Sequence, residues 1–205
     1  MTAAGSDAVR SVDPVSRSVR TARLVRVGVL LIAGLAITFT ATMHERLGFD
    51  VAVVGFALAA LGVAHFGEWV VCRAPVRTPV TLLLAVVGVG AAVGLALTST
   101  TVGFALVVAA WALASALLEF IGAATRPGSR QDAALVGSLG MLLAILALLV
   151  RDDQVAILGF FGGYAVIAGV FLGISAFDVK RGAPGARRDG ALPQPNPQNP
   201  VQSHQ

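Results

Sequence analysis

Residues 78–118 read TPVTLLLAVVGVGAAVGLALTSTTVGFALVVAAWALASALL, a stretch of 41 residues in which no side chain is charged. A helix needs about 20 apolar residues to cross the hydrocarbon core of a bilayer, so this stretch is long enough for two membrane spans. The polar residues Thr98-Ser99-Thr100-Thr101 divide the stretch and predict the turn between the two spans. The stretch therefore indicates a protein that crosses a membrane more than once.

The composition of the whole chain agrees with this interpretation. Hydrophobic residues make up 56% of the 205 residues and charged residues only 13%, against about 25% charged residues in an average soluble domain. In hydrocarbon every backbone N–H and C=O group needs a partner within the protein, which restricts spans to helices or closed barrels. The apolar runs here are continuous, whereas barrel strands alternate. We therefore expect an all-α integral membrane protein surrounded by the lipid bilayer.

We expect six transmembrane helices in one membrane domain, residues 27–181. The predicted spans cover residues 27–43, 51–72, 79–97, 101–123, 133–150 and 155–177. Residues 1–26 form a basic N-terminal segment ahead of them. Residues 182–205 are rich in Pro, Gln, Asn and Gly, a composition that cannot bury a core and predicts a disordered tail.

The basic residues predict the orientation of the chain. Of the 15 lysine and arginine residues, all but Arg46 and Arg151 fall in segments on one side of the predicted spans. Because basic loops stay in the cytoplasm, we expect both termini there. Arginine outnumbers lysine 14 to 1, and alanine, valine and glycine fill the spans, a composition that indicates a GC-rich bacterial genome and so the inner membrane of a bacterial cell. There the basic residues would meet anionic lipid headgroups. We do not expect nucleic acid as a partner, because no aromatic residues are interleaved with the basic ones.

A weak internal repeat indicates how the helices are arranged. Val-Gly-Phe-Ala-Leu occurs at 54–58 and again at 102–106, and the related Leu-Gly-Phe-Phe-Gly occurs at 158–162. The three copies lie at the start of the second, fourth and sixth predicted spans. Short loops make consecutive helices antiparallel neighbours. We therefore expect three antiparallel hairpin repeats.

Glycines on the sixth predicted span indicate close helix packing. Gly159 with Gly163, and Gly169 with Gly173, form two GxxxG pairs on one face of that helix. Small residues let helix backbones approach closely in lipid, where van der Waals contact replaces the hydrophobic effect. The pattern leaves open whether the partner is another helix of this chain or a second copy in a homo-oligomer.

Three ionisable residues lie deep enough in the predicted spans to be functional candidates, namely His65, Glu68 and Glu119. His65 and Glu68 share a helix face at spacing i, i+3, so they can pair, and Glu119 lies at a similar depth in the fourth span. One interpretation is a proton-responsive group of side chains. The other is an interfacial role, in which the two glutamates meet arginines such as Arg73 and Arg126.

The sequence contains no motif for catalysis. It has no phosphate-binding loop, no His/Cys cluster with metal-ligand spacing and no nucleophile motif. Its single cysteine, Cys72, excludes an intramolecular disulfide and a cysteine-based metal cluster. We therefore expect no enzyme, and no catalytic, cofactor-binding or metal site.

The chain resembles the HdeD family of small bacterial membrane proteins, which is linked to acid resistance. The resemblance rests on Leu30-Leu31-Ile32-Ala33-Gly34-Leu35 in the first span and on even-numbered helices, 51–73, 101–126 and 155–181, that begin with glycine-rich apolar runs and end at a basic residue. It covers residues 27–181 and implies six helices in hairpin repeats. The outward turns lack the proline frequent in the family, and the tail is atypical.

This resemblance implies a role in acid or envelope stress protection. Two other functions stay open. One is a small-solute or proton transporter or channel, although no span has the proline or charge near its centre that is typical of broken transporter helices. The other is a membrane scaffold that binds a protein partner.

Overall fold

The structure is a computed structural model that describes residues 14–44, 46–71, 78–125 and 130–178. These residues form helices and connecting turns, and none of them lies in a strand. The helices are α1 (Pro14–Phe39), η1 (Ala41–Met43), α2 (Leu47–Val71), α3 (Pro79–Ala96), α4 (Thr101–Thr125), α5 (Arg130–Leu149) and α6 (Gln154–Asp178). Each of the six α-helices contains a stretch long and apolar enough to cross a membrane. The chain is therefore a multi-pass membrane protein built from helices.

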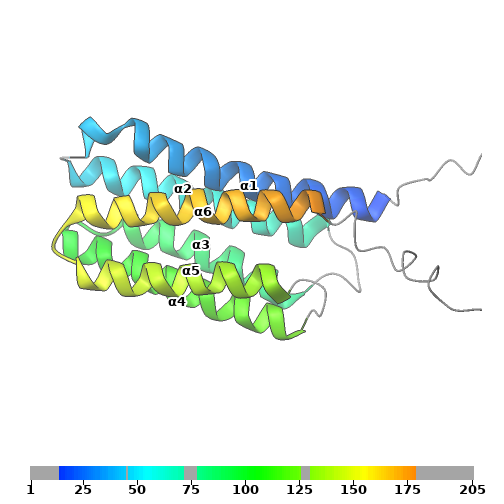
Figure 1. Cartoon of the computed structure of the whole chain (residues 1–205). Coiled ribbons are helices and arrows are strands. Elements are labelled where there is room, and N and C mark those ends of the chain that lie inside the picture. The colour runs from blue at the N-terminus through cyan, green and yellow to red at the C-terminus, as the bar shows by residue number, and fades with distance from the viewer. Residues whose placement is uncertain (1–13, 45, 72–77, 126–129, 179–205) are drawn as a thin grey trace, which may run out of the picture.

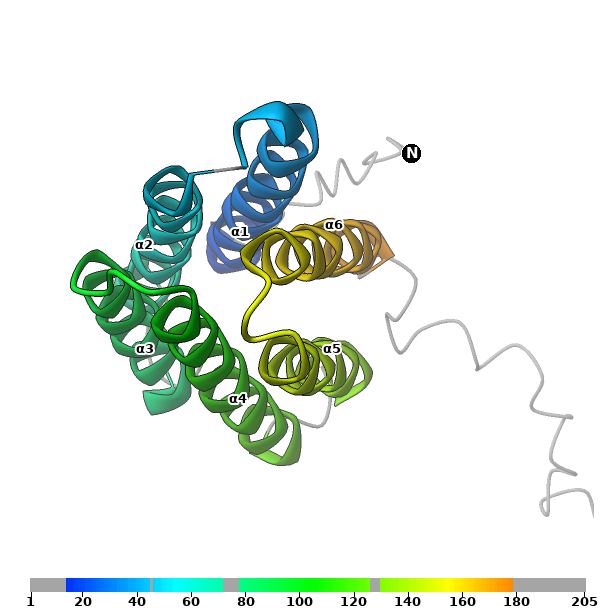
Figure 2. The same cartoon turned by 90° about the vertical axis from the view of Figure 1, so that its left-hand side faces the viewer.

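The six helices run lengthwise beside one another and form a bundle (Figure 1). Viewed along the bundle, they follow one another around a ring, which α1 closes by lying against α6 (Figure 2). We call the end at which α1 begins and α6 ends the base. We call the opposite end, which holds the α1–α2, α3–α4 and α5–α6 connections, the tip. Consecutive helices are antiparallel, so both ends of the described chain lie at the base.

Contacts between helices are unevenly distributed around the ring. They are most extensive between α2 and α3, between α4 and α5, and between α1 and α6, and less extensive within the pairs joined at the tip. The repeat predicts three hairpins, α1–α2, α3–α4 and α5–α6. The helices of each hairpin are not the most closely packed pairs in the structure. Small residues explain the closer pairs: a Cβ added to Gly88 of α3 would lie 3.0 Å from Cα of Gly62 in α2. A Cβ on Gly140 of α5 would lie 3.2 Å from the carbonyl oxygen of Ala112 in α4.

Helix boundaries differ most from expectation in the first helix. α1 begins at Pro14 and ends at Phe39, and its membrane-crossing stretch is Arg20–Phe39 rather than residues 27–43. Arg26, expected ahead of the membrane, therefore lies within that stretch. The other five helices begin and end within four residues of the expected spans. Residues 1–13 of the segment 1–26 and all of the tail 182–205 lie outside the described residues.

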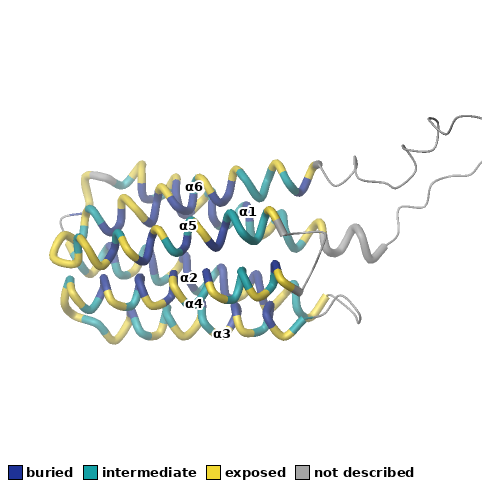
Figure 3. Tube along the Cα trace, turned by 60° about the horizontal axis from the view of Figure 1, so that its bottom comes forward, coloured by how far each residue is buried: buried dark blue, intermediate teal, exposed yellow. Residues whose placement is uncertain are grey.

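The interior of the bundle holds apolar side chains with an aromatic group at its centre. We call Phe104 and Trp111 of α4 and Phe161 and Tyr164 of α6 the aromatic layer; all four are buried. The Trp111 ring centroid lies 5.7 Å from that of Phe161 and 5.8 Å from that of Tyr164. Buried residues face the middle of the bundle and exposed ones face outward (Figure 3). Many of the exposed residues are large and apolar, for example Phe56 at 77% exposure, and lipid suits such a surface.

The four glycines of the predicted α6 packing face occupy two different environments. A Cβ on Gly169 would lie 2.9 Å from the Leu31 side chain, and a Cβ on Gly173 would lie 3.4 Å from that of Val27, so both face α1. Gly159 and Gly163 are exposed, and added Cβ atoms there would meet no described atom within 4 Å. Of the two GxxxG pairs, only Gly169 with Gly173 therefore packs against another helix within the described part of this chain.

Candidate functional site: two buried polar clusters

An ion pair links opposite sides of the ring near the base. Nη2 of Arg26 on α1 lies 2.5 Å from Oε1 of Glu119 on α4, and the two side chains are only 17% and 12% exposed. Arg26 reaches this position because α1 continues through it as a helix, while Glu119 lies six residues before the end of α4. Two opposite charges attract more strongly inside a protein than in water, and each is costly to bury alone. The pair therefore stabilises the charges that it brings into the membrane domain.

His65 of α2 lies beside this pair and is 6% exposed. Its Nδ1 is 2.8 Å from the carbonyl oxygen of Leu61, one turn earlier in the helix. A carbonyl oxygen only accepts hydrogen bonds, so Nδ1 carries the proton and Nε2 is an acceptor in the neutral ring. Nε2 is buried and has no hydrogen-bond partner among the described residues. The pairing of His65 with Glu68 that the i, i+3 spacing allows does not form, because Nδ1 is bonded to the helix backbone and Nε2 has no partner among the described residues.

Three cavities adjoin these side chains, with volumes of about 20, 50 and 80 Å³. Arg26 and Glu119 line all three, and His65 lines the two smaller ones. Glu68 lines the two larger ones together with Glu119, so the two glutamates share a space near the base, as their similar depth predicts. Each volume exceeds the 10–15 Å³ or so that one water molecule needs. We call Arg26, His65, Glu68 and Glu119 the basal cluster.

Asp132 and Ser175 extend the polar lining to the ends of their helices. Asp132 lies in the first turn of α5 and Ser175 in the last turn of α6, and both line the largest cavity. The Ser175 hydroxyl donates a hydrogen bond to Oδ2 of Asp132, which ties the two helices at the base. The Arg20 guanidinium lies 5.0 Å from the ring centroid of Phe177, a cation–π contact between α1 and α6.

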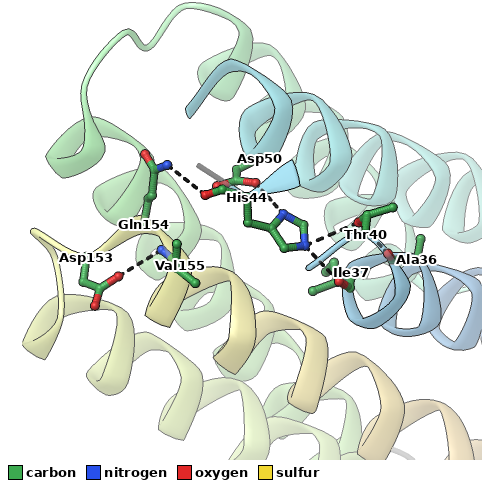
Figure 4. Close-up of polar contacts among 8 residues, drawn as sticks. All are labelled: Ala36, Ile37, Thr40, His44, Asp50, Asp153, Gln154 and Val155. Carbon is green, nitrogen blue, oxygen red and sulfur yellow. Dashed lines mark hydrogen bonds and ion pairs between the residues drawn. The ribbon is translucent and has the colours of Figure 1, made fainter. Parts of the chain in front are cut away.

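A second polar cluster lies at the tip (Figure 4). Nδ1 of His44 is 2.7 Å from Oδ1 of Asp50, and Nε2 of His44 is 2.8 Å from the carbonyl oxygen of Ile37. The amide of Gln154 donates a hydrogen bond of 3.2 Å to the carbonyl oxygen of His44. We call His44, Asp50 and Gln154 the tip cluster. It joins the end of α1, the first turn of α2 and the start of α6.

Hydrogen-bond geometry restricts the protonation of the tip cluster. Because the Ile37 carbonyl oxygen only accepts, Nε2 of His44 must carry a proton. His44 and Asp50 are then either imidazolium and carboxylate, or neutral imidazole and protonated carboxyl. In both forms the pair has no net charge, which suits its burial: His44 is 5% exposed and Asp50 0%. Oδ2 of Asp50 has no partner in the described part of the chain.

Asp153 begins α6 beside the tip cluster (Figure 4). Its Oδ1 accepts hydrogen bonds of 3.0 Å from the backbone N–H groups of Val155 and Ala156. Asp153 therefore caps the N-terminus of α6. The next residue, Gln154, reaches the α1–α2 connection through its hydrogen bond to the carbonyl oxygen of His44. The Asp153 side chain is exposed.

Sequence reasoning identified three of the four residues of the basal cluster. His65, Glu68 and Glu119 belong to the basal cluster, but Arg26 was missed because the first span was expected to begin one residue later. The arginines expected to meet the glutamates, Arg73 and Arg126, lie outside the described residues.

The tip cluster was missed entirely. The available signal was Asp50, an acid directly ahead of the uncharged run of the second span and six residues after His44. Within the described ranges, no group of three or more His, Cys, Asp or Glu side chains is placed to hold a metal ion.

Comparison with protein-family models, with curated proteins and with solved structures finds no match to this chain. The two clusters must therefore be interpreted from their own chemistry. The basal cluster combines opposite charges, a buried histidine whose acceptor nitrogen has no partner among the described residues, and cavities large enough for water. The tip cluster is held by the hydrogen bonds of His44 to Asp50 and to the Ile37 carbonyl oxygen.

Proposed function

We propose that this chain is a non-enzymatic protein of a bacterial cell membrane that acts in protection against acid or envelope stress, with the basal cluster as its proton-responsive centre. The observation that carries the proposal is the buried Arg26–Glu119 ion pair beside His65, whose Nε2 has no partner among the described residues. The resemblance of residues 27–181 to the HdeD family points to the same role.

The chemistry of the basal cluster supports a response to acid. Histidine and carboxylate side chains take up protons as the pH falls through the acidic range. A proton on Glu119 removes the charge that balances Arg26, and a proton on Nε2 of His65 adds a second cation to the same cavity. Either event changes the interaction between α1, α2 and α4. Acid would thus alter the packing of three helices through one small group of side chains.

The proposal includes an orientation in the membrane. With both termini in the cytoplasm, the base faces the cytoplasm and the tip faces outward, as the positions of the basic residues predict. In this arrangement the repeat at 54–58, 102–106 and 158–162 begins each helix that runs inward from the tip. The HdeD resemblance implies the same arrangement, in which the repeat relates three hairpins to one another.

Survival after an acid pulse tests the proposed function. A strain of the source bacterium that lacks the gene would be complemented with the wild type, Glu119→Gln or Asp152→Asn, at equal protein levels checked by immunoblot. We expect the deletion to reduce survival, and the wild type and Asp152→Asn to restore it, because the Asp152 side chain is exposed at the tip. Glu119→Gln should fail to restore it.

Two results would contradict the proposal in different ways. A deletion strain that survives acid as well as its parent would reject the acid-protection role altogether. Full rescue by Glu119→Gln would be consistent with a role in acid protection but would show that this role does not depend on the basal cluster.

A proton or small-solute transporter is the second candidate, favoured by the cavities of about 50 and 80 Å³ lined by charged side chains. The purified protein in liposomes loaded with a pH-sensitive dye would test it. A transporter should dissipate an imposed pH gradient faster than empty liposomes, and Glu119→Gln should slow it. Dissipation at the rate of empty liposomes would reject proton transport.

A further inference from the structure

We propose that the three basal cavities form one hydrated vestibule that binds water and passes protons between the base and His65, and that the aromatic layer closes it toward the tip. The inference rests on the function proposed above in one respect: it assumes that the site responds to protons, which reach it along bound water molecules. The arrangement of cavities and polar atoms supports the route itself.

The innermost cavity presents two complementary polar atoms. Nε2 of His65 is an acceptor and Nε of Arg26 is a donor, and both are buried without a hydrogen-bond partner among the described residues. Both residues line the cavity of about 20 Å³, which has room for one water molecule. A single water can accept from Arg26 and donate to His65 at the same time. A buried polar atom without a hydrogen-bond partner is costly, so hydration of this cavity is favourable.

Shared lining residues connect this cavity to the base. Arg26 and Glu119 border all three cavities, and the largest of them reaches Asp132 and Ser175 at the helix ends. His65 itself lies six residues before the end of α2 at Val71, which corresponds to about 9 Å along the helix axis. Two or three water molecules in a row would cover that distance.

The charges around the vestibule favour a proton over an anion. Among the described residues, titratable groups line it from five of the six helices, and the only polar side chain that α3 contributes is Thr81, which does not titrate in this range. They are Arg23 and Arg26 on α1, His65 and Glu68 on α2, Glu119 on α4, Asp132 on α5 and Tyr164 on α6. Three carboxylates face two guanidinium groups, so the lining attracts cations when the carboxylates are ionised.

The aromatic layer ends the vestibule on the side of the tip. Trp111 and Tyr164 border the innermost cavity, while Phe104 and Phe161 are fully buried behind them. Trp111 lies eight residues closer to the tip than Glu119 on the same helix, about 12 Å along the axis. Phenylalanine rings offer water no hydrogen-bond partner, so the water chain stops there.

Thiol accessibility to silver ions tests the route. Single cysteines would be introduced into the full-length protein with Cys72 replaced by serine. Ser115→Cys probes the innermost cavity and Ala133→Cys the two larger ones. Ala147→Cys, on the same helix as Ala133 but toward the tip and 0% exposed, is the matched control. Ag⁺ would be added to vesicles of either orientation, and the thiols left unreacted would be counted after unfolding.

We expect Ser115→Cys and Ala133→Cys to react at least ten times faster with Ag⁺ added on the base side than on the tip side, and Ala147→Cys to stay unreacted from both. Equal rates from the two sides, or an unreactive Ser115→Cys while Ala133→Cys reacts, would overturn the inference. Size-exclusion profiles matching that of the Cys72→Ser protein establish that the variants fold.

The outcome is separable from that of the acid-survival experiment. One-sided Ag⁺ access in a protein whose deletion has no acid phenotype would leave the vestibule in place and reject the acid role. An acid phenotype without Ag⁺ access would leave the role in place and reject the route.

Discussion

Arg26 places a guanidinium group inside the bundle, and among the described residues Glu119 is the carboxylate within ion-pair distance of it. At the residue scale, the properties of the basal cluster depend on this pair, because it links α1 to α4 across 93 residues of sequence. An ion pair inside a protein has a desolvation cost that offsets much of its Coulomb attraction. Its removal as a unit is therefore far less harmful than the removal of one partner.

Single and double substitutions of the pair test this argument. Glu119→Leu leaves the Arg26 charge buried without a partner, and we expect it to lower the free energy of unfolding by about 3–5 kcal/mol. The double variant Arg26→Met/Glu119→Leu should recover most of that loss. Denaturant titration in detergent, followed by circular dichroism, measures both.

The exposed pair at the tip provides the control for these measurements. The side chains of Arg151 and Asp152 are 63% and 81% exposed and 3.8 Å apart, so Asp152→Asn should change the stability by less than about 1 kcal/mol. A Glu119→Leu variant as stable as Asp152→Asn would show that the Arg26 charge is already solvated.

At the element scale, small residues decide which helices pack most closely. Gly62 with Gly88 joins α2 to α3, and Gly34 lies against α6, where an added Cβ would be 3.1 Å from the carbonyl oxygen of Gly162. In lipid, helices associate through such close backbone contact rather than through the hydrophobic effect. The tip cluster adds a polar link of a different kind, because His44 and its partners connect α1, α2 and α6 through hydrogen bonds.

Two glycines of α3 form a matched pair for testing this packing. A Cβ at Gly88 would meet backbone atoms of Gly62 and Leu58 at 3.0–3.1 Å, and backbone atoms cannot move away without separating the helices. We expect Gly88→Ala to destabilise the protein by about 1–3 kcal/mol. Gly90→Ala, two residues along, meets nothing within 4 Å and should be neutral or slightly stabilising. Thermal unfolding in detergent measures both, and equal midpoints would contradict the packing argument.

At the scale of the whole molecule, the ring of six helices places polar groups at its two ends and apolar groups between them. An even number of spans brings the start of α1 and the end of α6 to the same end of the bundle (Figure 1). The basal cluster, with its cavities, is at that end, and the tip cluster, with the buried pair His44 and Asp50, is at the other. The two faces of the membrane would therefore meet chemically different ends of the protein.

Reporter fusions test which face each end meets. If both termini are cytoplasmic, green fluorescent protein fused to either terminus should fluoresce. Alkaline phosphatase should be inactive at the C-terminus and active when inserted between Ser99 and Thr100, at the tip. Active phosphatase at the C-terminus would invert the orientation and would place the proposed vestibule on the outer face.

The sequence by itself determined that the chain forms six apolar helices, because partition between water and lipid depends on the composition of each run and not on its neighbours. It also pointed to His65, Glu68 and Glu119, because an ionisable residue inside an apolar run is conspicuous wherever the helix packs. Only the tertiary structure decided that Glu119 meets Arg26, that His65 turns to Leu61 rather than to Glu68, and that His44 and Asp50 are buried together at the tip. These contacts depend on the ring order and on the rotation of each helix about its axis, and both follow from packing between helices distant in the sequence.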